Sequence, residues 1–267
     1  MRDYVFPEIG SRPVAEVTAA EVIEVLKPIW FSKPETAGRV LQRIKATFDS
    51  AILRGTREKA NPCVGITREL GTDHRKVRHH RALRWLEVPV FFENMQSRGL
   101  MPVTRLLFEF LILTVARSGE ARGALWREVD IEGRTWTIPG SDPASHRRMK
   151  SGESHIVPLS DRVIDVLSEA RKLHGGYLIF PGVKGRPLSD NVLSKLMRDW
   201  DVPGTPHGFR SAFKDWAAEA GIRDEVSEAA LAHADRDMVR AAYRRTRFPD
   251  ERRVLMQRWA EFLTSSR

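Results

Sequence analysis

The chain has 267 residues, of which 42% are hydrophobic and 30% are charged, and its formal net charge is +9. This length has room for two domains, since single cores rarely grow beyond roughly 250 residues. The surplus of Lys and Arg favours a polyanionic partner, most commonly nucleic acid, although basicity by itself is weak support because many other proteins share it.

Cysteine content and hydropathy exclude two further classes. The single cysteine, Cys63, excludes an intrachain disulfide and a cysteine-built metal site, and it fits a reducing compartment. The longest apolar run, 106–115, contains Glu109 and is far shorter than the roughly 20 residues that span a bilayer. Because the N-terminus also lacks the apolar segment of a signal peptide, we expect a cytoplasmic protein without a membrane partner.

The first 72 residues are predicted to form a small helical domain. Two capping boxes, Thr18/Glu21 and Ser32/Glu35, mark helix starts. Apolar residues then recur at helical spacing until Gly55 offers a stop, and they are Val40, Ile44, Phe48 and Ala51. Three cations lie off this stripe, on a face that is either simply solvated or contacts DNA: Arg39, Arg43 and Lys45.

Residues 73–84 are predicted to be a basic linker. The stretch 71–84 contains five Arg or Lys and three His with almost nothing to bury. Such a tether is more often a solvated connector than a binder, but beside DNA-binding domains Arg75, Lys76 and Arg78 are candidates for backbone contacts.

A second domain, 85–267, is predicted to be mainly helical with one small antiparallel sheet. Residues 101–115 are nearly apolar all round, as in a buried central helix. Strands are expected at 134–138 and 155–159, with a basic hairpin at 146–153. Further helices are expected at 161–174, 190–200 and 206–220.

Two helix starts in this domain carry cations. In TPHGFRSAFKDWAAEAG, Thr205 is a candidate cap and Pro206 a first helical residue, which places His207 and Arg210 on one face. A helix start already attracts anions, so this pair could clamp a phosphate, or be incidental surface residues.

The stretch TVARSGE holds a second candidate cation. Arg117 stands between two helices, with Ser118 as the expected cap of the second and Glu120 in its first turn. The bland interpretation is a capped turn. The functional one is a rigidly mounted guanidinium that makes a two-pronged phosphate contact.

Three further residues complete the candidate set. Lys150 lies in a basic turn, where most lysines are solvated but one could protonate a leaving alkoxide. His233 in LAH is, alone, more often structural. Tyr243 in MVRAAYRRTRF is surrounded by cations, which suits a tyrosine that meets a phosphate, and they are Arg240, Arg244, Arg245 and Arg247.

Taken in order, these motifs closely resemble those of the tyrosine recombinases, the phage-integrase family. The matching stretches are ARSGE, the basic hairpin before HIVPLS, HGFR, LAH and AAYRRTRFPDERRVLMQRWAEFL. They cover 82–267 and look most like the prophage and genomic-island branch. The segment FPEIGSRPVAEVTAAEV also resembles the start of that family's helical core-binding domain, so the resemblance implies this domain followed by a DNA breaking-rejoining catalytic domain.

The resemblance also implies a mechanism. Tyr243 would attack a DNA phosphate to give a covalent 3′-phosphotyrosine, with Arg117, Arg210 and His233 stabilising the transition state. His207 would accept a proton, Lys150 would protonate the leaving oxygen and Glu120 would orient an arginine. No cofactor and no metal would be needed. The partners would be double-stranded attachment-site DNA and a homotetramer on it, with weak or no association otherwise, and accessory DNA-bending proteins are a further candidate. The hairpin and tail add DNA-contact candidates, namely Arg147, Arg148, Arg244 and Arg245.

Two departures from the family pattern stand out. The chain opens directly in the core-binding domain, so it is either a fragment or lacks the arm-binding domain usual in this branch. Ala232 also stands where many relatives have glycine, without an expected loss. The last segment, 252–263, carries four apolar residues at helical spacing that pack in cis or on a neighbour: Val254, Leu255, Trp259 and Phe262.

Two rival functions remain at this stage. One is a DNA-binding integrase remnant without catalysis, which the full motif set disfavours. The other is a type IB topoisomerase-like enzyme, which applies similar chemistry to one duplex; the helical N-terminal domain and the integrase-like tail favour recombination.

Overall fold

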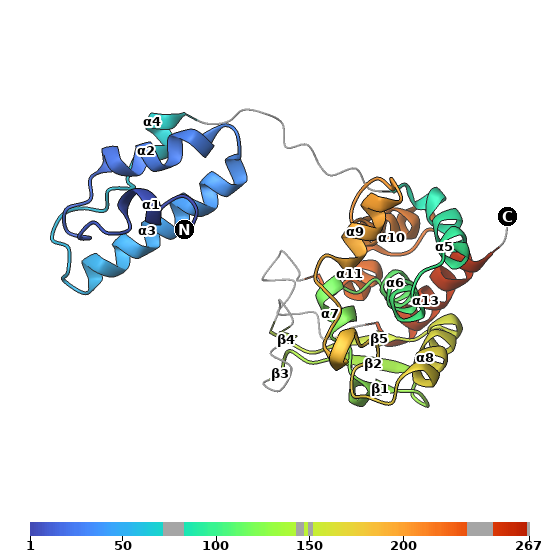
Figure 1. Cartoon of the computed structure of the whole chain (residues 1–267). Helices are drawn as coiled ribbons and strands as arrows, with labels where there is room; N and C mark the ends of the chain where they lie inside the picture. The colour runs from blue at the N-terminus through green and yellow to red at the C-terminus, as the bar shows by residue number, and fades with distance from the viewer. Residues whose placement is uncertain (72–82, 143–146, 149–151, 234–247, 266–267) are drawn as a thin grey trace. The chain divides into compact units, whose positions relative to one another are not determined.

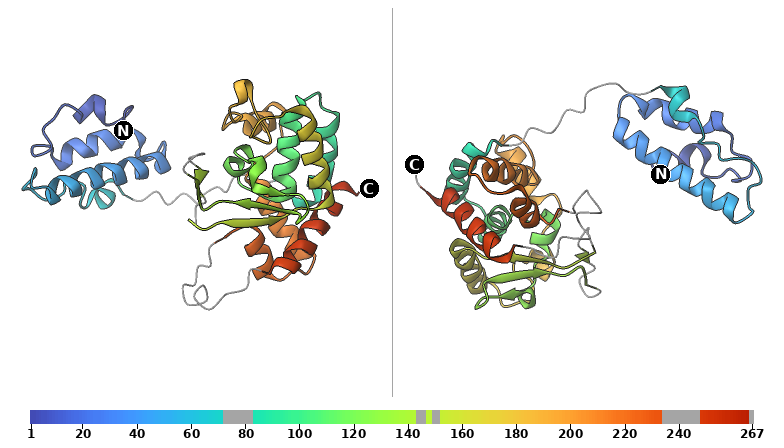
Figure 2. Two further views of the ribbon diagram at one scale, coloured as in Figure 1. Left: turned by 90° about the horizontal axis from the view of Figure 1, so that it is seen from below. Right: turned by 180° about the vertical axis from the view of Figure 1, so that it is seen from behind.

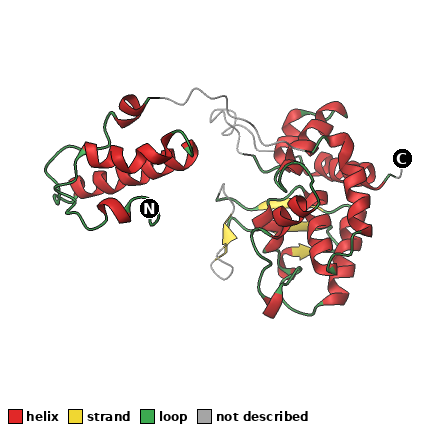
Figure 3. Ribbon diagram, turned by 45° about the horizontal axis from the view of Figure 1, so that its top comes forward, coloured by secondary structure: helices red, strands yellow, loops and turns green. Residues whose placement is uncertain are grey.

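The computed structural model describes residues 1–71, 83–142, 147–148, 152–233 and 248–265. The chain divides into two compact units, Met1–Arg78 and His79–Arg267. Each unit has its own hydrophobic core, and each is described separately below. Helices predominate in both, as Figure 3 shows by colour.

The first unit is a small helical bundle (Figure 1). Its helices are α1 (Phe6–Ile9), α2 (Ala19–Trp30), α3 (Pro34–Leu53) and α4 (Ile66–Leu70). The predicted stripe of α3 is buried from Ala37 to Ala51, and it packs on the apolar face of α2. Gly55 adopts φ +70 just after α3 ends, so the predicted helix stop is confirmed.

One of the two predicted capping boxes is correct and the other is wrong. Thr18 and Glu21 cap each other's backbone N–H groups at the start of α2. Ser32 instead donates to the carbonyl of Pro28 at 2.8 Å, and α3 begins at Pro34 without a side-chain cap. Because α2 runs until Trp30, the Ser32 hydroxyl lies closest to the orphan carbonyls at the end of that helix.

The second unit is built around helix α6, which runs through its middle and is contacted by α5, α7, α8 and α13 (Figure 1). Its helical segments are η1 (Trp85–Glu87), α5 (Val88–Ser97), α6 (Pro102–Thr114), α7 (Ser118–Arg122), η2 (Trp126–Glu128), α8 (Asp161–Leu173), η3 (Val183–Gly185), α9 (Val192–Asp199), α10 (Gly208–Glu219), α11 (Asp224–Ala230) and α13 (Pro249–Thr264). Every residue of α6 from Leu106 to Thr114 is buried, as the all-round apolar pattern predicts.

A three-stranded antiparallel sheet lies against this helical core. It is formed by β1 (Val129–Asp130), β2 (Thr135–Ile138) and β5 (His155–Pro158), in the order β1-β2-β5. The fully buried Trp136 pairs with Val157 in register and contacts the ring of Phe110 at 4.9 Å between centroids. Both predicted strands are therefore confirmed, and a second ladder joins β3 (Ser141–Asp142) to β4 (Arg147–Arg148).

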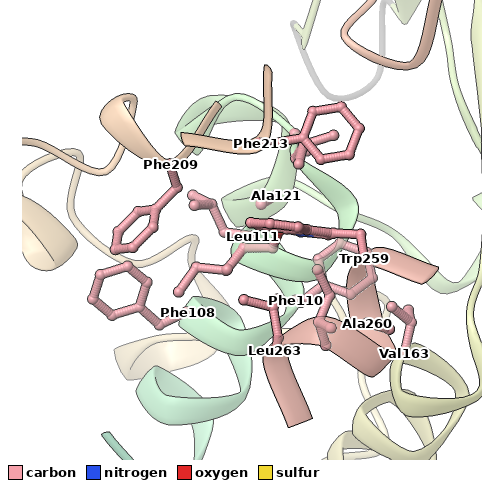
Figure 4. Close-up of a cluster of buried hydrophobic side chains, with 14 of the residues drawn as sticks. Phe108, Phe110, Leu111, Ala121, Val163, Phe209, Phe213, Trp259, Ala260 and Leu263 are labelled. Carbon is pink, nitrogen blue, oxygen red and sulfur yellow. The ribbon is translucent and has the colours of Figure 1, made fainter. Parts of the chain in front are cut away.

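The last helix packs on its own unit. In Figure 4, Trp259, Ala260 and Leu263 of α13 lie among phenylalanines of α6 and α10. Trp259 is fully buried and donates from its indole to the Ile112 carbonyl at 2.9 Å. Of the four predicted apolar positions, Val254 is 60% exposed and does not belong to the buried face. Figure 2 shows α13 from two further sides.

The described part of the chain has no helix that is both long and apolar enough to cross a membrane.

Candidate active site

Arg117 occupies the turn between α6 and α7. Its backbone N–H donates to Glu120 Oε2 at 2.9 Å, and its Nη1 donates to Glu120 Oε1 at 2.8 Å. Glu120 therefore caps α7 and holds the guanidinium at the same time. The expectation that Ser118 caps this helix is wrong, because Ser118 is already its first helical residue and the cap position is Arg117.

The end of α6 carries backbone strain at this point. Val115 has φ +48 and ψ 27, a left-handed conformation that is unusual for a β-branched residue. The turn directs the Val115 carbonyl to Arg210, whose Nη1 donates to it. Strain of this kind persists where the surroundings over-determine it, and it is common at functional sites.

Arg210 lies in the first turn of α10 and is only 4% exposed. Its Nη2 donates to the Leu231 carbonyl at 2.6 Å and lies 3.1 Å from His233 Nε2. Burial, and then the nearby charge of Arg117, lower the pKa of Arg210 to about 10, which leaves the guanidinium charged at neutral pH. Its Nε is buried and has no hydrogen-bond partner among the described residues.

The backbone carbonyls at the C-terminal end of α11 bind side chains of the candidate site. Three consecutive carbonyls there accept hydrogen bonds from three distant segments: Ala230 from His155 Nε2 at 3.2 Å, Leu231 from Arg210, and Ala232 from Arg117 Nη2 at 3.4 Å. The last carbonyls of a helix lack partners within the helix and form its partially negative pole. They are therefore suited to hold guanidinium and imidazole donors in place.

His233 follows these carbonyls directly. Its Nδ1 lies 2.8 Å from Glu228 Oε2, while its Nε2 faces Arg210. The preceding residue, Ala232, has φ +49. This is a conformation that glycine adopts more easily than alanine, which gives a physical reason for the glycine expected at this position in relatives.

His207 stands at the cap position of α10, and the helix itself begins at Gly208. The expected helix start, with Pro206 as its first residue, is two residues too early. Partial burial and the charges of Arg210 and Arg117 lower the pKa of His207. The imidazole is therefore mainly neutral at neutral pH and available to accept a proton.

The remaining candidates are placed less completely. Six of them, together with most of the predicted linker, lie outside the described residues: Arg75, Lys76, Arg78, Lys150, Arg244 and Arg245. The same holds for Tyr243, the candidate nucleophile. Arg147 and Arg148 form β4, but the description does not extend to their side chains.

In the first unit, two of the three candidate DNA-contact residues are paired with acids one helical turn away. Arg39 Nη2 lies 2.6 Å from Glu35 Oε1, and Lys45 Nζ lies 2.8 Å from Asp49 Oδ2. These pairs and Arg43 lie on the exposed side of α3, away from its buried stripe.

The arrangement in the second unit brings guanidinium N–H donors and the imidazoles of His155 and His233 to the end of α11, backed by the carboxylates of Glu120 and Glu228. Charge-assisted donors of this kind suit a phosphate group. Within the described residues there is no group of three or more His, Cys, Asp or Glu that could hold a metal ion.

Comparison with known proteins decides the family. The family model described as "Phage integrase family" matches residues 82–249, and that of the "Phage integrase central domain" matches residues 1–65. The chain belongs to the phage integrase family. The first match includes all six predicted catalytic positions, from Arg117 to Tyr243.

Several named integrases are similar along nearly the whole chain. The integrase of Enterobacteria phage P4 is 32% identical over an alignment of 280 positions, which covers 99% of this chain and 63% of the P4 protein. Prophage integrase IntA of Escherichia coli K12 is 31% identical over an alignment of 268 positions, which covers 98% of this chain and 63% of IntA. This integrase-family chain thus spans somewhat less than two thirds of the length of these two relatives.

Solved integrase structures share the fold. The Tn1549 transposon integrase, in complex with a circular intermediate DNA, gives a TM-score of 0.66 at 17% identity, over 93% of this chain and 87% of that one. A lambda integrase dimer bound to a COC′ core site gives 0.61 at 19% identity, over 84% and 81%.

Three parts of the site escaped sequence reasoning. His155 begins the strand in HIVPLS and was visible there only as a strand residue. Glu228 lies five residues before His233, which is not a helical pairing distance. The carbonyls of residues 115 and 230–232 leave no mark in a sequence, since every residue has one.

Proposed function

We propose that this chain is a site-specific DNA recombinase that cleaves and rejoins DNA through a covalent 3′-phosphotyrosine. One observation carries the proposal: Arg117, Arg210 and His233, from three separate segments, meet at the end of α11. Two guanidiniums held on backbone carbonyls, with an imidazole held beside them by Glu228 and Arg210, form a rigid receptor for one phosphate. The family membership supports the same conclusion.

In the proposed reaction, the phenol oxygen of Tyr243 attacks the phosphorus and the bond from phosphorus to the 5′ oxygen breaks. The phenol proton passes to His207, and Lys150 protonates the departing oxygen to leave a free 5′-hydroxyl. A free phenol, with a pKa near about 10, is a poor nucleophile at neutral pH. Neighbouring guanidiniums favour its phenolate form. The phosphotyrosine stores the bond energy, so the 5′-hydroxyl of another strand can reverse the step without a cofactor.

Arg117 and Arg210 take the role of transition-state donors to the nonbridging oxygens, with His233 assisting. Each positioned donor of this type contributes on the order of 10²–10³ in rate. Glu120 takes a supporting role, because its carboxylate holds the Arg117 guanidinium from behind.

The division of labour between the units is part of the proposal. Residues 1–72 bind core-site DNA and residues 85–267 carry the chemistry, with 73–84 as a basic tether. A lambda integrase structure is a tetramer bound to a Holliday junction, and we infer a tetramer on DNA here as well. We also infer that the protein acts in the cytoplasm on the DNA of a mobile element, together with accessory DNA-bending proteins.

A nicked suicide substrate tests the proposal. It is a duplex from the DNA flanking the gene, nicked beside the cleavage point so that the short released strand diffuses away. The expected result is a covalent protein–DNA adduct with wild type, formed equally well in EDTA, and none with Tyr243→Phe.

Tyr177→Phe is the matched control, because Tyr177 is 69% exposed and lies outside the proposed site; its adduct yield should equal that of wild type. Persistence of the adduct in Tyr243→Phe, or its loss in EDTA, contradicts the proposal. Strand exchange between two duplexes then separates a recombinase from a topoisomerase, which relaxes one duplex only.

A further inference from the structure

We propose that Glu228 is a positioning residue for this reaction: it keeps the ring proton of His233 on Nδ1, so that Nε2 accepts a hydrogen bond from Arg210 and holds that guanidinium at the phosphate site. Lys214 in turn holds Glu228 in place. The proposal rests on the proposed function and adds two residues, Glu228 and Lys214, that neither the motifs nor the family comparison single out.

The tautomer of His233 follows from its two neighbours. The guanidinium Nη2 of Arg210 lies 3.1 Å from Nε2 and has only hydrogens to offer. Nε2 must therefore accept, and the ring proton belongs on Nδ1, where Glu228 Oε2 accepts it at 2.8 Å. The opposite tautomer would set an Nε2 hydrogen against the hydrogens of Arg210 and leave a lone pair facing a carboxylate.

Lys214 on α10 directs one of its three donors to Glu228, and the other two, to Asp224 and Ser227, fix the ammonium group in place. Its Nζ lies 2.6 Å from Glu228 Oε1, 2.6 Å from Asp224 Oδ1 and 2.9 Å from Ser227 Oγ. Burial alone would raise the pKa of Glu228, but the hydrogen bonds from Lys214 and His233 outweigh it and hold that pKa below its ordinary value. Glu228 is therefore ionised at neutral pH.

The result is a continuous chain of hydrogen bonds from Lys214 through Glu228 and His233 to Arg210. Networks of this kind orient a catalytic imidazole in other enzymes, where a buried carboxylate sets the tautomer without touching the substrate. Here the same logic also steadies Arg210, whose Nη2 would otherwise lack its second partner.

Glu228→Gln is a sharp test. The carboxylate of Glu228 accepts from two neighbours, Lys214 and His233, whereas the amide of glutamine has only one acceptor oxygen. The charged Lys214 takes the oxygen, so the amide NH₂ turns to His233. Nδ1 must then accept, and the ring proton moves to Nε2, against Arg210. The matched control is Glu225→Gln, which removes the same charge from the same helix and has no described contact with the site.

The first readout is the ¹⁵N NMR signal of the His233 ring in the free protein at pH 8, assigned by its loss in His233→Gln. We expect a protonated Nδ1 in wild type and Glu225→Gln, and a protonated Nε2 in Glu228→Gln. A protonated Nε2 in wild type overturns the proposal. That measurement needs no substitution at Glu228, so it stays decisive if this variant fails to fold.

The second readout is single-turnover cleavage of the suicide substrate. We expect Glu228→Gln to cleave about tenfold more slowly with an unchanged dissociation constant for DNA, which is a fraction of the effect of removing a direct donor. In a His233→Ala background, Glu228→Gln should not slow cleavage further, because the imidazole that Glu228 positions is already gone.

The two proposals fail separately. Unchanged cleavage by Glu228→Gln beside an active wild type overturns the positioning role alone. No adduct with wild type overturns the proposed function, and the positioning role of Glu228 in catalysis with it, while the ring signal still reports the hydrogen bond.

Discussion

The cations of the two units are held in opposite ways. In the first unit, Arg39 pairs with Glu35 on the surface of α3, and both side chains are more than 70% exposed. In the second, Arg210 is 4% exposed and bonds to carbonyls 95 and 21 positions away. A cation held only by an acid in its own helix can be replaced with little loss of stability. A cation held by backbone carbonyls from distant segments, such as Arg210, depends on the whole fold for its position.

The largest expected difference between the units concerns ion pairs. Glu109 is fully buried on α6 and pairs with Arg105 and, at 2.6 Å, with Arg162. Glu109→Gln removes the buried carboxylate from between two part-buried guanidiniums, which keep only Glu169 as an acidic partner among the described residues, and should lower the free energy of unfolding by about 3 kcal/mol. Urea denaturation measures this.

The counterpart is Glu35→Gln, which breaks the exposed pair with Arg39 and should cost less than about 1 kcal/mol. Equal losses of unfolding free energy for Glu109→Gln and Glu35→Gln would show that burial does not make the ion pairs of the two units differ in strength.

The next effect concerns activity. Arg210→Lys keeps the charge but loses the planar fork that reaches two carbonyls and His233 at once. We expect cleavage of the suicide substrate to slow by about 10²–10³. Arg39→Lys in the first unit should cleave as wild type does, and a cleavage defect there as large as that of Arg210→Lys would erase the contrast.

A third effect is acid sensitivity confined to the second unit. Burial, with the charges of Arg252, Arg210 and Arg117, lowers the pKa of His155 to about 3, against about 6.5 when unfolded. Between these values only the unfolded state binds the proton, so stability falls as pH falls. From pH 7 to pH 5 the loss should be about 2 kcal/mol.

Thermal unfolding across this pH range measures the effect, with His155→Gln expected to flatten the dependence. His174, which is exposed, supplies the control: His174→Gln should keep the wild-type slope. The same slope in all three proteins would exclude His155 as its source.

The smallest effect concerns one methyl group beside the site. Ala232 has φ +49, so Ala232→Gly should relieve strain and raise stability by up to about 1 kcal/mol. Ala229→Gly, within α11, should lower it by about 1 kcal/mol. Opposite shifts of Tm for the two variants are expected, and a loss in both would mean that Ala232 is not strained.

Much of the fold could be predicted from the sequence alone. The stripe of α3, the buried α6 and the strands around Trp136 and Val157 all lie where periodicity predicts. The errors fall at helix starts, at Ser32, Ser118 and Pro206, because several nearby groups compete there to cap or open the same helix. Tyr243 and Lys150 remain predictions, since they lie outside the described residues.

The order of the motifs was enough to identify the family, and it made Arg117, His207, Arg210 and His233 candidates, since chemistry at a phosphate demands particular side chains in the chain. How those side chains are held was decided only in three dimensions. Backbone carbonyls at Val115 and at the end of α11, and the Lys214–Glu228 pair, arrange them. Hydrogen bonds across long sequence separations depend on where the backbone passes, and no local pattern of residue types encodes that.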